Sequence, residues 1–339
     1  MSMQRFVRLS VITALLILTA LPAVAQADDV LTVYSGRNES LIGPILAQFT
    51  EDSGIAIEVL YGGTSAVANQ ILTEGENSPA DVFIAQDGGA LGALAAADML
   101  HKLPSATLER VIDRAFVSPD GFWAGLSGRA RVLVYNPESL EALGLELPES
   151  ILDLTDERWR GQVGWAPTNA SFVANVTAMR VLLGEEETAE WLAGMIANSV
   201  QAYPKNTPIV QAVIDGEVAV GLVNHYYLFR FLAEDPNISA TLHFFPGGDL
   251  GSLINVAGTA ILNTTDQPFV ALELVNYLLS DTAQEYFAQT TYEYPLVATV
   301  EPSVALPALA DIEAPDIDLS DLDDLQGTLE MIEESGALD

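Results

Sequence analysis

Short apolar runs alternate with segments of helical spacing along most of the chain. The runs at 30–35, 55–61 and 80–87 are rich in Val, Ile and Leu, which is typical of strands. Between the first two runs, apolar residues at 41–49 recur every three or four positions, which predicts a helix. Alternating strands and helices favour parallel sheets covered by helices on both faces. The expected fold class is therefore α/β.

The same alternation continues to the end of the chain. Further strands are predicted over 129–137, 161–167, 217–223 and 253–262, and further helices over 64–76, 89–100, from about 171, from 226 and over 268–289. A terminal helix is predicted after Leu325, ended by Gly336. Leu319, Leu322 and Leu325 keep helical spacing, so we expect most of this tail to pack on the folded protein.

The amino-terminal segment has the three parts of a secretory signal. Arg5 and Arg8 precede a short apolar core at 9–21, and small residues follow. Cleavage is expected after Ala25 or at the end of the predicted signal peptide, 1–27. The apolar core is too short to be a good membrane span, so we expect an exported, periplasmic protein.

Composition narrows the function classes. The chain has no Cys, which excludes disulfides, thiol nucleophiles and zinc–thiolate sites. It has 13 Lys and Arg against 47 Asp and Glu, a net charge of −34. Such a surface argues against nucleic-acid binding, which needs a basic footprint. A cation-binding surface is one explanation for this acidic protein, but solvation in a saline habitat is the preferred one.

Motifs for catalysis are missing from the sequence. There is no GxGxxG after a strand, no GxxxxGK[ST], no HExxH and no GxSxG. His101, His225 and His243 are far apart in the chain. The "GGTSA" turn at 62–66 resembles a glycine-rich anion turn, but such turns are common before helices. We therefore predict that the protein is not an enzyme.

Small and polar residues dominate the turns that follow the predicted strands. In open parallel sheets, ligands bind beyond the carboxyl ends of the strands, where helix amino termini point into a crevice. Each such turn alone could be an ordinary helix cap. Together they favour an anion held by backbone N–H groups. The turns are 35–38, 61–65, 86–87, 167–171 and 224–227.

Two adjacent tyrosines, Tyr226 and Tyr227, end one of these turns. Neighbouring side chains point to opposite faces of a strand, but at the first turn of a helix both could reach one small ligand. The alternative is that each phenol is simply half buried with its hydroxyl in water. Ferric iron prefers anionic oxygen, and only a strongly polarising cation displaces a phenolic proton whose pKa is normally about 10. Two phenolates would leave the iron with a single positive charge, which carbonate or phosphate could neutralise.

A bound anion needs cationic partners of its own. The guanidinium of arginine matches carbonate or phosphate with two parallel hydrogen bonds. Arg37 and Arg129 are the predicted partners, because they lie in or near the strand-end turns. The alternative for any arginine here is a surface ion pair in an acidic protein, and we expect that for Arg131.

The chain resembles the periplasmic ferric-ion-binding proteins that serve ABC importers. The matching segments are "LTVYSGRNESLIGPILAQFTEDSGI", "SPADVFIAQDGGALGALAAADML", "GLSGRARVLVYNP", "WRGQVGWAPTNASF", "DGEVAVGLVNHYY" and "YEYPLV". The resemblance implies a two-lobed, type II Venus-flytrap fold in which Tyr226 and Tyr227 coordinate Fe³⁺. It also implies that Arg129 clamps carbonate. Further anion-binding positions implied by the resemblance are Asn169, Ala170, Ser171, Asn206 and Asn224.

The sequence departs from this family at three positions. Asn38 stands where some members have His, Gln86 stands near a Glu of some members, and Phe172 stands near a third tyrosine of others. Asp87, His225 and Tyr61 are further candidate metal ligands. The alternative role of His225 is to orient the tyrosine pair or cap the helix, and the alternative for Tyr61 is to pack at the sheet edge.

These observations predict an exported solute-binding protein that captures ferric iron with carbonate or phosphate and delivers it to ABC permease subunits. We expect a monomer with crossing strands near 128–133 and 250–258. The predicted lobes are 28–130 plus 256–305, and 131–255 plus 306–339. One alternative is the same fold with a small organic anion or polyamine as ligand. The other is a hydrolase or transferase that uses the cleft.

Overall fold

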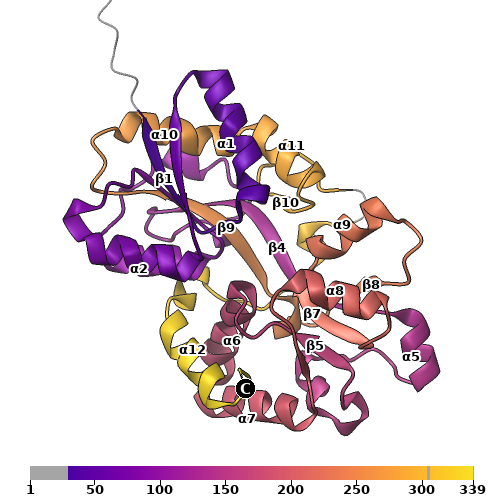
Figure 1. The fold of residues 1–339 in the computed structure, drawn as a ribbon. Helices are drawn as coiled ribbons and strands as arrows, with labels where there is room; N and C mark the ends of the chain where they lie inside the picture. Colours follow the sequence, from indigo (N-terminus) through magenta and orange to yellow (C-terminus); the bar gives the residue numbers. More distant parts are fainter. Residues whose placement is uncertain (1–29, 304–305, 339) are drawn as a thin grey trace, which may run out of the picture.

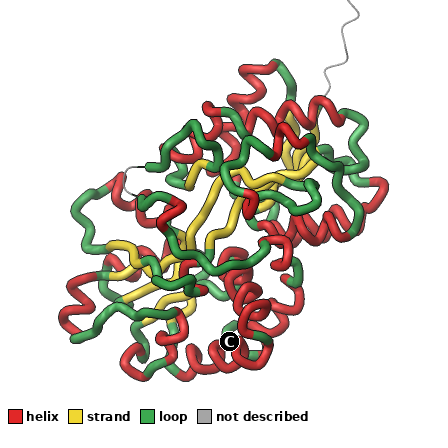
Figure 2. Tube along the Cα trace, turned by 180° about the vertical axis from the view of Figure 1, so that it is seen from behind, coloured by secondary structure: helices red, strands yellow, loops and turns green. Residues whose placement is uncertain are grey.

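The computed structural model describes residues 30–303 and 306–338, so the predicted signal peptide 1–27 lies outside the described residues. Figure 1 shows two groups of helices and strands, one around β1 and α1 and the other around β5 and α6. The strands β4 and β9 run between the two groups, and Figure 2 shows them from behind as part of a continuous yellow band. Within the described ranges, no helix is long and apolar enough to cross a membrane.

The strands pair in the order β2-β1-β3-β9-β4-β7-β5-β6, and β8 and β10 both pair with β4. The pairs β1–β2, β1–β3, β5–β6 and β5–β7 are parallel, as the alternating pattern predicts. The pairs made by β4, and that between β3 and β9, are antiparallel. Their bounds are β1 Leu31–Ser35, β2 Ile57–Tyr61, β3 Val82–Ala85, β4 Ala124–Tyr135, β5 Val163–Trp165, β6 Gln201–Ala202, β7 Val220–Asn224, β8 Thr241–His243, β9 Ile254–Ile261 and β10 Tyr294–Pro295.

Most of the long helices lie where apolar spacing predicts them, whereas α4, α5, α7 and α8 were not predicted. Asn38 caps α1, since its side chain accepts a hydrogen bond from the N–H of Ser40, and Gly54 ends this helix in a left-handed conformation. The bounds are α1 Glu39–Ser53, α2 Thr64–Glu74, α3 Gly88–Ala96, α4 Ser105–Leu108, α5 Pro137–Leu143, α6 Ala170–Leu183, α7 Glu185–Ala197, α8 Asn206–Ile214, α9 Tyr226–Glu234, α10 Pro268–Leu278, α11 Asp281–Gln289 and α12 Leu325–Glu334.

The long strand β4 belongs to both halves of the molecule. Its first part pairs with β9 as far as Ala130, and its second part pairs with β7 from Arg131 onward. The strand begins at Ala124, five residues before the predicted start at 129. The prediction missed its start because the first residues are mostly small and lack the Val and Ile pattern that marks a buried strand. The two long strands β4 and β9 thus lie where crossing strands were expected. The residue ranges of the two lobes stay a prediction.

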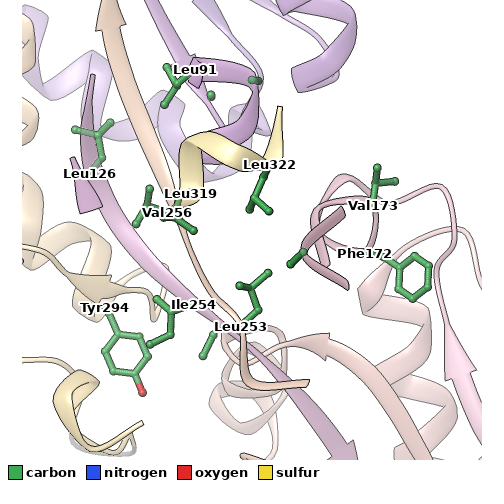
Figure 3. Close-up of a cluster of buried hydrophobic side chains, with 14 of the residues drawn as sticks. Leu91, Leu126, Phe172, Val173, Leu253, Ile254, Val256, Tyr294, Leu319 and Leu322 are labelled. Atoms are coloured by element: carbon green, nitrogen blue, oxygen red, sulfur yellow. The ribbon is translucent and has the colours of Figure 1, made fainter. Parts of the chain in front are cut away.

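The carboxyl-terminal tail packs on the helix α3 of the first half. The 3₁₀ turn Leu319–Leu322 lies against α3, and Figure 3 shows its two leucines near Leu91 of α3 and Val256 of β9. A Cβ atom at Gly89 would collide with the backbone carbonyl of Leu322. The small residues at the start of α3 therefore let the backbone of the tail approach closely.

The helix α12 packs instead on α6 in the second half. Arg180 of α6 donates hydrogen bonds to Thr328 Oγ1, 2.7 Å away, and to Asp324 Oδ2, 2.8 Å away. The hydroxyls of Thr177 and Thr328 lie 2.8 Å apart in the buried contact between the two helices. The tail is therefore docked, as its leucine spacing predicts, and it contacts both halves.

Substituting Gly89 with Ala should displace the tail from α3. The added methyl group meets backbone rather than a movable side chain, so we expect a loss of about 1–3 kcal/mol in the free energy of unfolding. Urea unfolding followed by circular dichroism measures it. Gly63→Ala is the control, because nothing lies within 4 Å of a Cβ there. Equal stability of the two variants would show that the tail is not packed as described.

Candidate metal site

The turn from β7 into α9 places Tyr226 and Tyr227 side by side. Their ring centroids are 4.4 Å apart and the rings are inclined by 31°. The side chain of Tyr226 is buried, with 1% of its surface exposed, whereas Tyr227 is half buried. The helix begins at Tyr226, so the two phenols share its first turn, as the sequence predicts. Their role as metal ligands stays a proposal.

His225 fixes this turn to the central strand. Its backbone N–H donates to the carbonyl of Ala130 at 3.0 Å, and its Nδ1 accepts from the N–H of Ala130 at 3.1 Å. Its Nε2 donates to the carbonyl of Tyr292 at 2.8 Å. Burial lowers the pKa of His225 to about 4, so the ring is neutral near pH 7. Both ring nitrogens are hydrogen-bonded to backbone atoms, which favours the alternative role of orienting the tyrosine turn; the role of His225 as a metal ligand stays a prediction.

Arg129 and Arg131 lie together in a small enclosed pocket of about 10 Å³. Each side chain is almost fully buried, with 3% of the residue surface exposed. Within the described residues, neither guanidinium forms an ion pair, and the Nε atoms of both have no hydrogen-bond partner. Burial lowers the pKa of Arg131 to about 10; the nearby Tyr226 and Tyr227 oppose this effect, and Arg129 adds to it. These are the features of a site that would hold an anion.

The expectation of a surface ion pair for Arg131 is wrong. Arg131 points inward and donates to Asn224 Oδ1 at 3.2 Å. The signal that could have revealed this is its spacing from Arg129, because residues two apart on a strand share a face. The "RAR" stretch therefore brings two guanidiniums into the same pocket rather than one.

The polar residues predicted to hold an anion form one hydrogen-bonded group. Asn224 Nδ2 donates to Ser171 Oγ at 3.0 Å, and the N–H of Ser171 donates to Asn169 Oδ1 at 3.0 Å. Asn206 Nδ2 donates to the same oxygen of Asn169 at 3.2 Å. Ala170 begins α6 beside them and lines the adjoining cleft. The structure thus brings together residues from the starts of two helices, α6 and α8, and from the end of β7.

Arg37 is already paired with a carboxylate. Its Nη2 lies 2.7 Å from Glu293 Oε2, and its Nη1 donates to Ser127 Oγ at 3.0 Å. Both members of this ion pair are buried. The prediction that Arg37 offers free charge to an anion is therefore not supported, because Glu293 neutralises it. Glu293 was missed in the sequence, although it lies within the "YEYPLV" segment.

Asp87 and Tyr61 lie away from the tyrosine pair in the chain, and their role as metal ligands stays a prediction. Asp87 caps α3, with Oδ1 accepting from the N–H of Ala90 at 3.0 Å, and burial raises its pKa. Its Oδ2 is buried and has no hydrogen-bond partner among the described residues. Tyr61 is exposed at the end of the edge strand β2 and lines the cleft, so it is not packed away at the sheet edge. Among the described residues, no group of three or more His, Cys, Asp or Glu could hold a metal ion.

A cleft of about 760 Å³ separates the two halves beside this site. One wall comes from the turns at 36–39 and 61–66 of the first half, including the "GGTSA" turn. The other wall comes from 168–170 and from Tyr227 of the second half. Gln86 lines both the cleft and the small arginine pocket. The strand-end turns predicted to face a ligand therefore meet in one place.

A two-lobed α/β structure with a polar cleft between its halves defines a class of proteins that capture small solutes. The sequence profile described as "Bacterial extracellular solute-binding protein" matches residues 77–324. The chain therefore belongs to this family of bacterial extracellular solute-binding proteins.

Relatives with known names share most of the chain. The "Major ferric iron-binding protein" of Neisseria meningitidis is 32% identical over 324 residues, covering 95% of this chain and 97% of its own. The crystal structure of iron-bound HitA from Pseudomonas aeruginosa is 33% identical with a TM-score of 0.84, covering 91% of this chain and 99% of HitA. A Trichodesmium protein in complex with iron and citrate is 25% identical with a TM-score of 0.76, covering 91% and 99% of the two chains. These comparisons confirm the predicted family and the two-lobed fold.

The ion pair between Arg37 and Glu293 should contribute strongly to stability. Glu293→Gln leaves the guanidinium buried without a counter-charge, so we expect a loss of about 3–5 kcal/mol in the free energy of unfolding at pH 7. Arg160→Gln is the control, because its pair with Glu157 is exposed and should contribute about 0–1 kcal/mol. Urea unfolding of both variants at pH 7 measures the difference.

The pH dependence gives a second check on the same pair. Burial alone would raise the pKa of Glu293, but Arg37 and Arg129 lower it. As a result, the pKa of Glu293 in the folded protein lies below the ordinary value of 4.5. A lowered folded-state pKa gives stability above the unfolded-state pKa that is lost as the pH falls through the folded-state value. The stability difference between parent and Glu293→Gln should therefore shrink as the pH falls below 4.5. A constant difference would contradict this account.

Proposed function

We propose that the protein captures Fe³⁺ in the cleft, with a synergistic anion, for delivery to an ABC import permease. The observation that carries the proposal is the pair Tyr226 and Tyr227 beside two buried guanidiniums that have no carboxylate partner within the described residues. Such a site combines two oxygen donors for a hard cation with positive charge for an accompanying anion.

The phenol of Tyr226 is protonated in the metal-free protein. Burial raises the pKa of Tyr226 above its ordinary value, Tyr227 raises it further, and Arg129 opposes this shift. Only a strongly polarising cation would displace the Tyr226 proton near pH 7. A trivalent iron ion meets that requirement, and its binding would release protons to solvent. Divalent ions such as Ca²⁺ and Mg²⁺ prefer carboxylate, carbonyl and water oxygens and would bind poorly here.

The anion would lie against Arg129 and Arg131. Carbonate or phosphate would supply negative charge and the remaining coordination sites of the iron. Asn224 already holds Arg131 in place, and Ser171 holds Asn224. The enclosed pocket itself has room for about one water molecule, so an anion would extend from it past Gln86 into the larger cleft.

Several relatives support the same assignment. Proteins named for ferric iron binding or iron uptake match most of this chain, and one solved neighbour contains iron with citrate. We extend from them to this chain the periplasmic location, cleavage of the signal peptide 1–27 and the permease partner. We also propose a monomer whose two lobes are 28–130 plus 256–305, and 131–255 plus 306–339. Asp87 and Tyr61 are proposed as additional metal ligands on cleft closure.

Two alternatives make different demands on the cleft. A small organic anion or a polyamine would not need two adjacent phenols, and neither would produce a visible charge-transfer colour. A hydrolase or transferase would need a nucleophile activated by a base. Among the described residues, the hydrogen bonds of His225 and His243 go to backbone atoms and not to a serine. We therefore propose a binding role rather than a catalytic one.

Removing either phenolic hydroxyl should abolish the colour of the iron complex. Tyr226→Phe and Tyr227→Phe keep the ring and its packing, so the fold should be retained. Each variant should lose most of the visible tyrosinate charge-transfer band and bind Fe³⁺ far more weakly. Absorption titration with ferric citrate measures both effects. Tyr203→Phe is the matched control, because that phenol is bonded to Glu217 at 2.9 Å outside the cleft. Unchanged spectra in both site variants would contradict the ferric assignment.

Neutralising Arg129 should weaken retention of iron through loss of the anion. We expect Arg129→Gln to lower resistance to a competing chelator by at least about tenfold, the equivalent of about 1.4 kcal/mol. The effect should depend on bicarbonate in the buffer. Arg158→Gln is the control, because Arg158 is exposed, whereas the buried Arg131 would itself affect the site. Equal behaviour of the Arg129 and Arg158 variants would reduce Arg129 to a structural residue.

A further inference from the structure

Two exposed cations stand on the second-half wall of the cleft. Lys205 precedes α8 and Arg230 lies in α9, and both line the 760 Å³ cleft. Neither side chain forms an ion pair within the described ranges, although the chain has 47 acidic residues and only 13 Lys and Arg. In a protein of net charge −34, two unpaired cations beside a ligand site are a local exception to the charge of the surface.

Arg230 lies next to the solvent-facing phenol of the proposed metal site. Residues three apart share one face of a helix, so Tyr227 and Arg230 lie one above the other on α9. Both also line a second hollow of about 530 Å³ that adjoins the cleft, together with Thr207 of α8. Lys205 borders the same cleft from the start of α8. Arg230 therefore lies beside Tyr227, and Lys205 lines the same cleft.

The volume of the cleft is large for a metal ion with a small inorganic anion. A water molecule takes about 30 Å³ in the liquid, so 760 Å³ corresponds to many water molecules. The helix α2 on the opposite wall begins at Thr64, and its N-cap residue Gly63 supplies no side-chain cap, so the first backbone N–H groups of the helix border this space. The cleft therefore has room and donors for several oxygen atoms beyond those that contact the metal.

We propose that Lys205 and Arg230 form a specificity lip that recognises the free carboxylates of an anionic ferric polycarboxylate chelate. This inference rests on the proposed function, since Tyr226 and Tyr227 would hold the iron of the chelate. Arg230 can bind a carboxylate with two parallel hydrogen bonds, and Lys205 adds a point charge. An acidic surface repels anions in general, so these two cations would select for chelates that carry carboxylates at this position.

The test compares two forms of iron with the same set of variants. Ferric citrate is the chelate probe, and ferric chloride added in small portions to citrate-free bicarbonate buffer is the second probe. The variants are Lys205→Gln, Arg230→Gln and their combination, with Arg158→Gln as an exposed control. Binding is followed by the charge-transfer band, and retention of radiolabelled citrate is measured after gel filtration.

We expect the parent to retain citrate together with iron. The double variant should bind ferric citrate at least about tenfold more weakly and lose the citrate label, which is the effect of removing two charge-assisted contacts. Its resistance to a competing chelator after loading in bicarbonate should change by less than about twofold, because exposed charges contribute little to the metal site itself. Arg158→Gln should behave as the parent with both probes.

Three results would contradict the proposal that Lys205 and Arg230 recognise the chelate. They are failure of the parent to retain citrate, equal losses for both forms of iron, and no loss in the double variant. Failure of the proposed function looks different: the parent would show no charge-transfer band with either probe. Because the substituted side chains are exposed, a loss of binding without a change in the thermal unfolding temperature reports on the ligand and not on folding.

Discussion

The site depends on how the β7–α9 turn is held against the strand β4. His225 makes hydrogen bonds to both backbone polar groups of Ala130, and its other ring nitrogen reaches Tyr292. This bonding lets the chain leave the strand and enter the helix at a fixed place, so that two consecutive phenols point to one side. Because β4 pairs with strands of both halves, the same contact ties the tyrosine pair to the junction between them.

Three arginines are buried at this junction, and they differ in whether a carboxylate pairs with them. Arg37 is neutralised by Glu293. Ser127 accepts a hydrogen bond from Arg37 and Thr291 donates one to Glu293, while Arg37 Nε and Glu293 Oε1 have no hydrogen-bond partner among the described residues. Arg129 and Arg131 have no carboxylate partner within the residues described. Burying a charge is costly unless it is paired. Arg129 lowers the pKa of nearby Glu293 without forming an ion pair with it, so two guanidiniums that lack an ion pair are expected where a ligand supplies further negative charge. The acidic exterior and the basic pocket thus serve different purposes.

Most of the strands and long helices could be predicted from the sequence because apolar spacing is a local signal, whereas short elements such as β6, β8 and β10 and the helices α4, α5, α7 and α8 were missed. The turn at Tyr226 could be predicted for the same reason, since it follows a clear strand and precedes an amphipathic helix. The partner of Arg37 could not, because Glu293 is distant in sequence and no local pattern links them. The burial of Arg131 could have been inferred from its spacing with Arg129. The two hydrogen bonds of the His225 ring required the fold, because they join three separate segments.

The central claim is that both phenols bind one ferric ion beside the two guanidiniums. A crystal structure of the iron-loaded protein, with anomalous diffraction recorded on both sides of the iron absorption edge, tests it most directly. The account predicts one iron peak within bonding distance of the hydroxyl oxygens of Tyr226 and Tyr227, with an anion between the metal and Arg129. An iron peak elsewhere in the molecule, or density for an organic ligand in the cleft without iron, would contradict it.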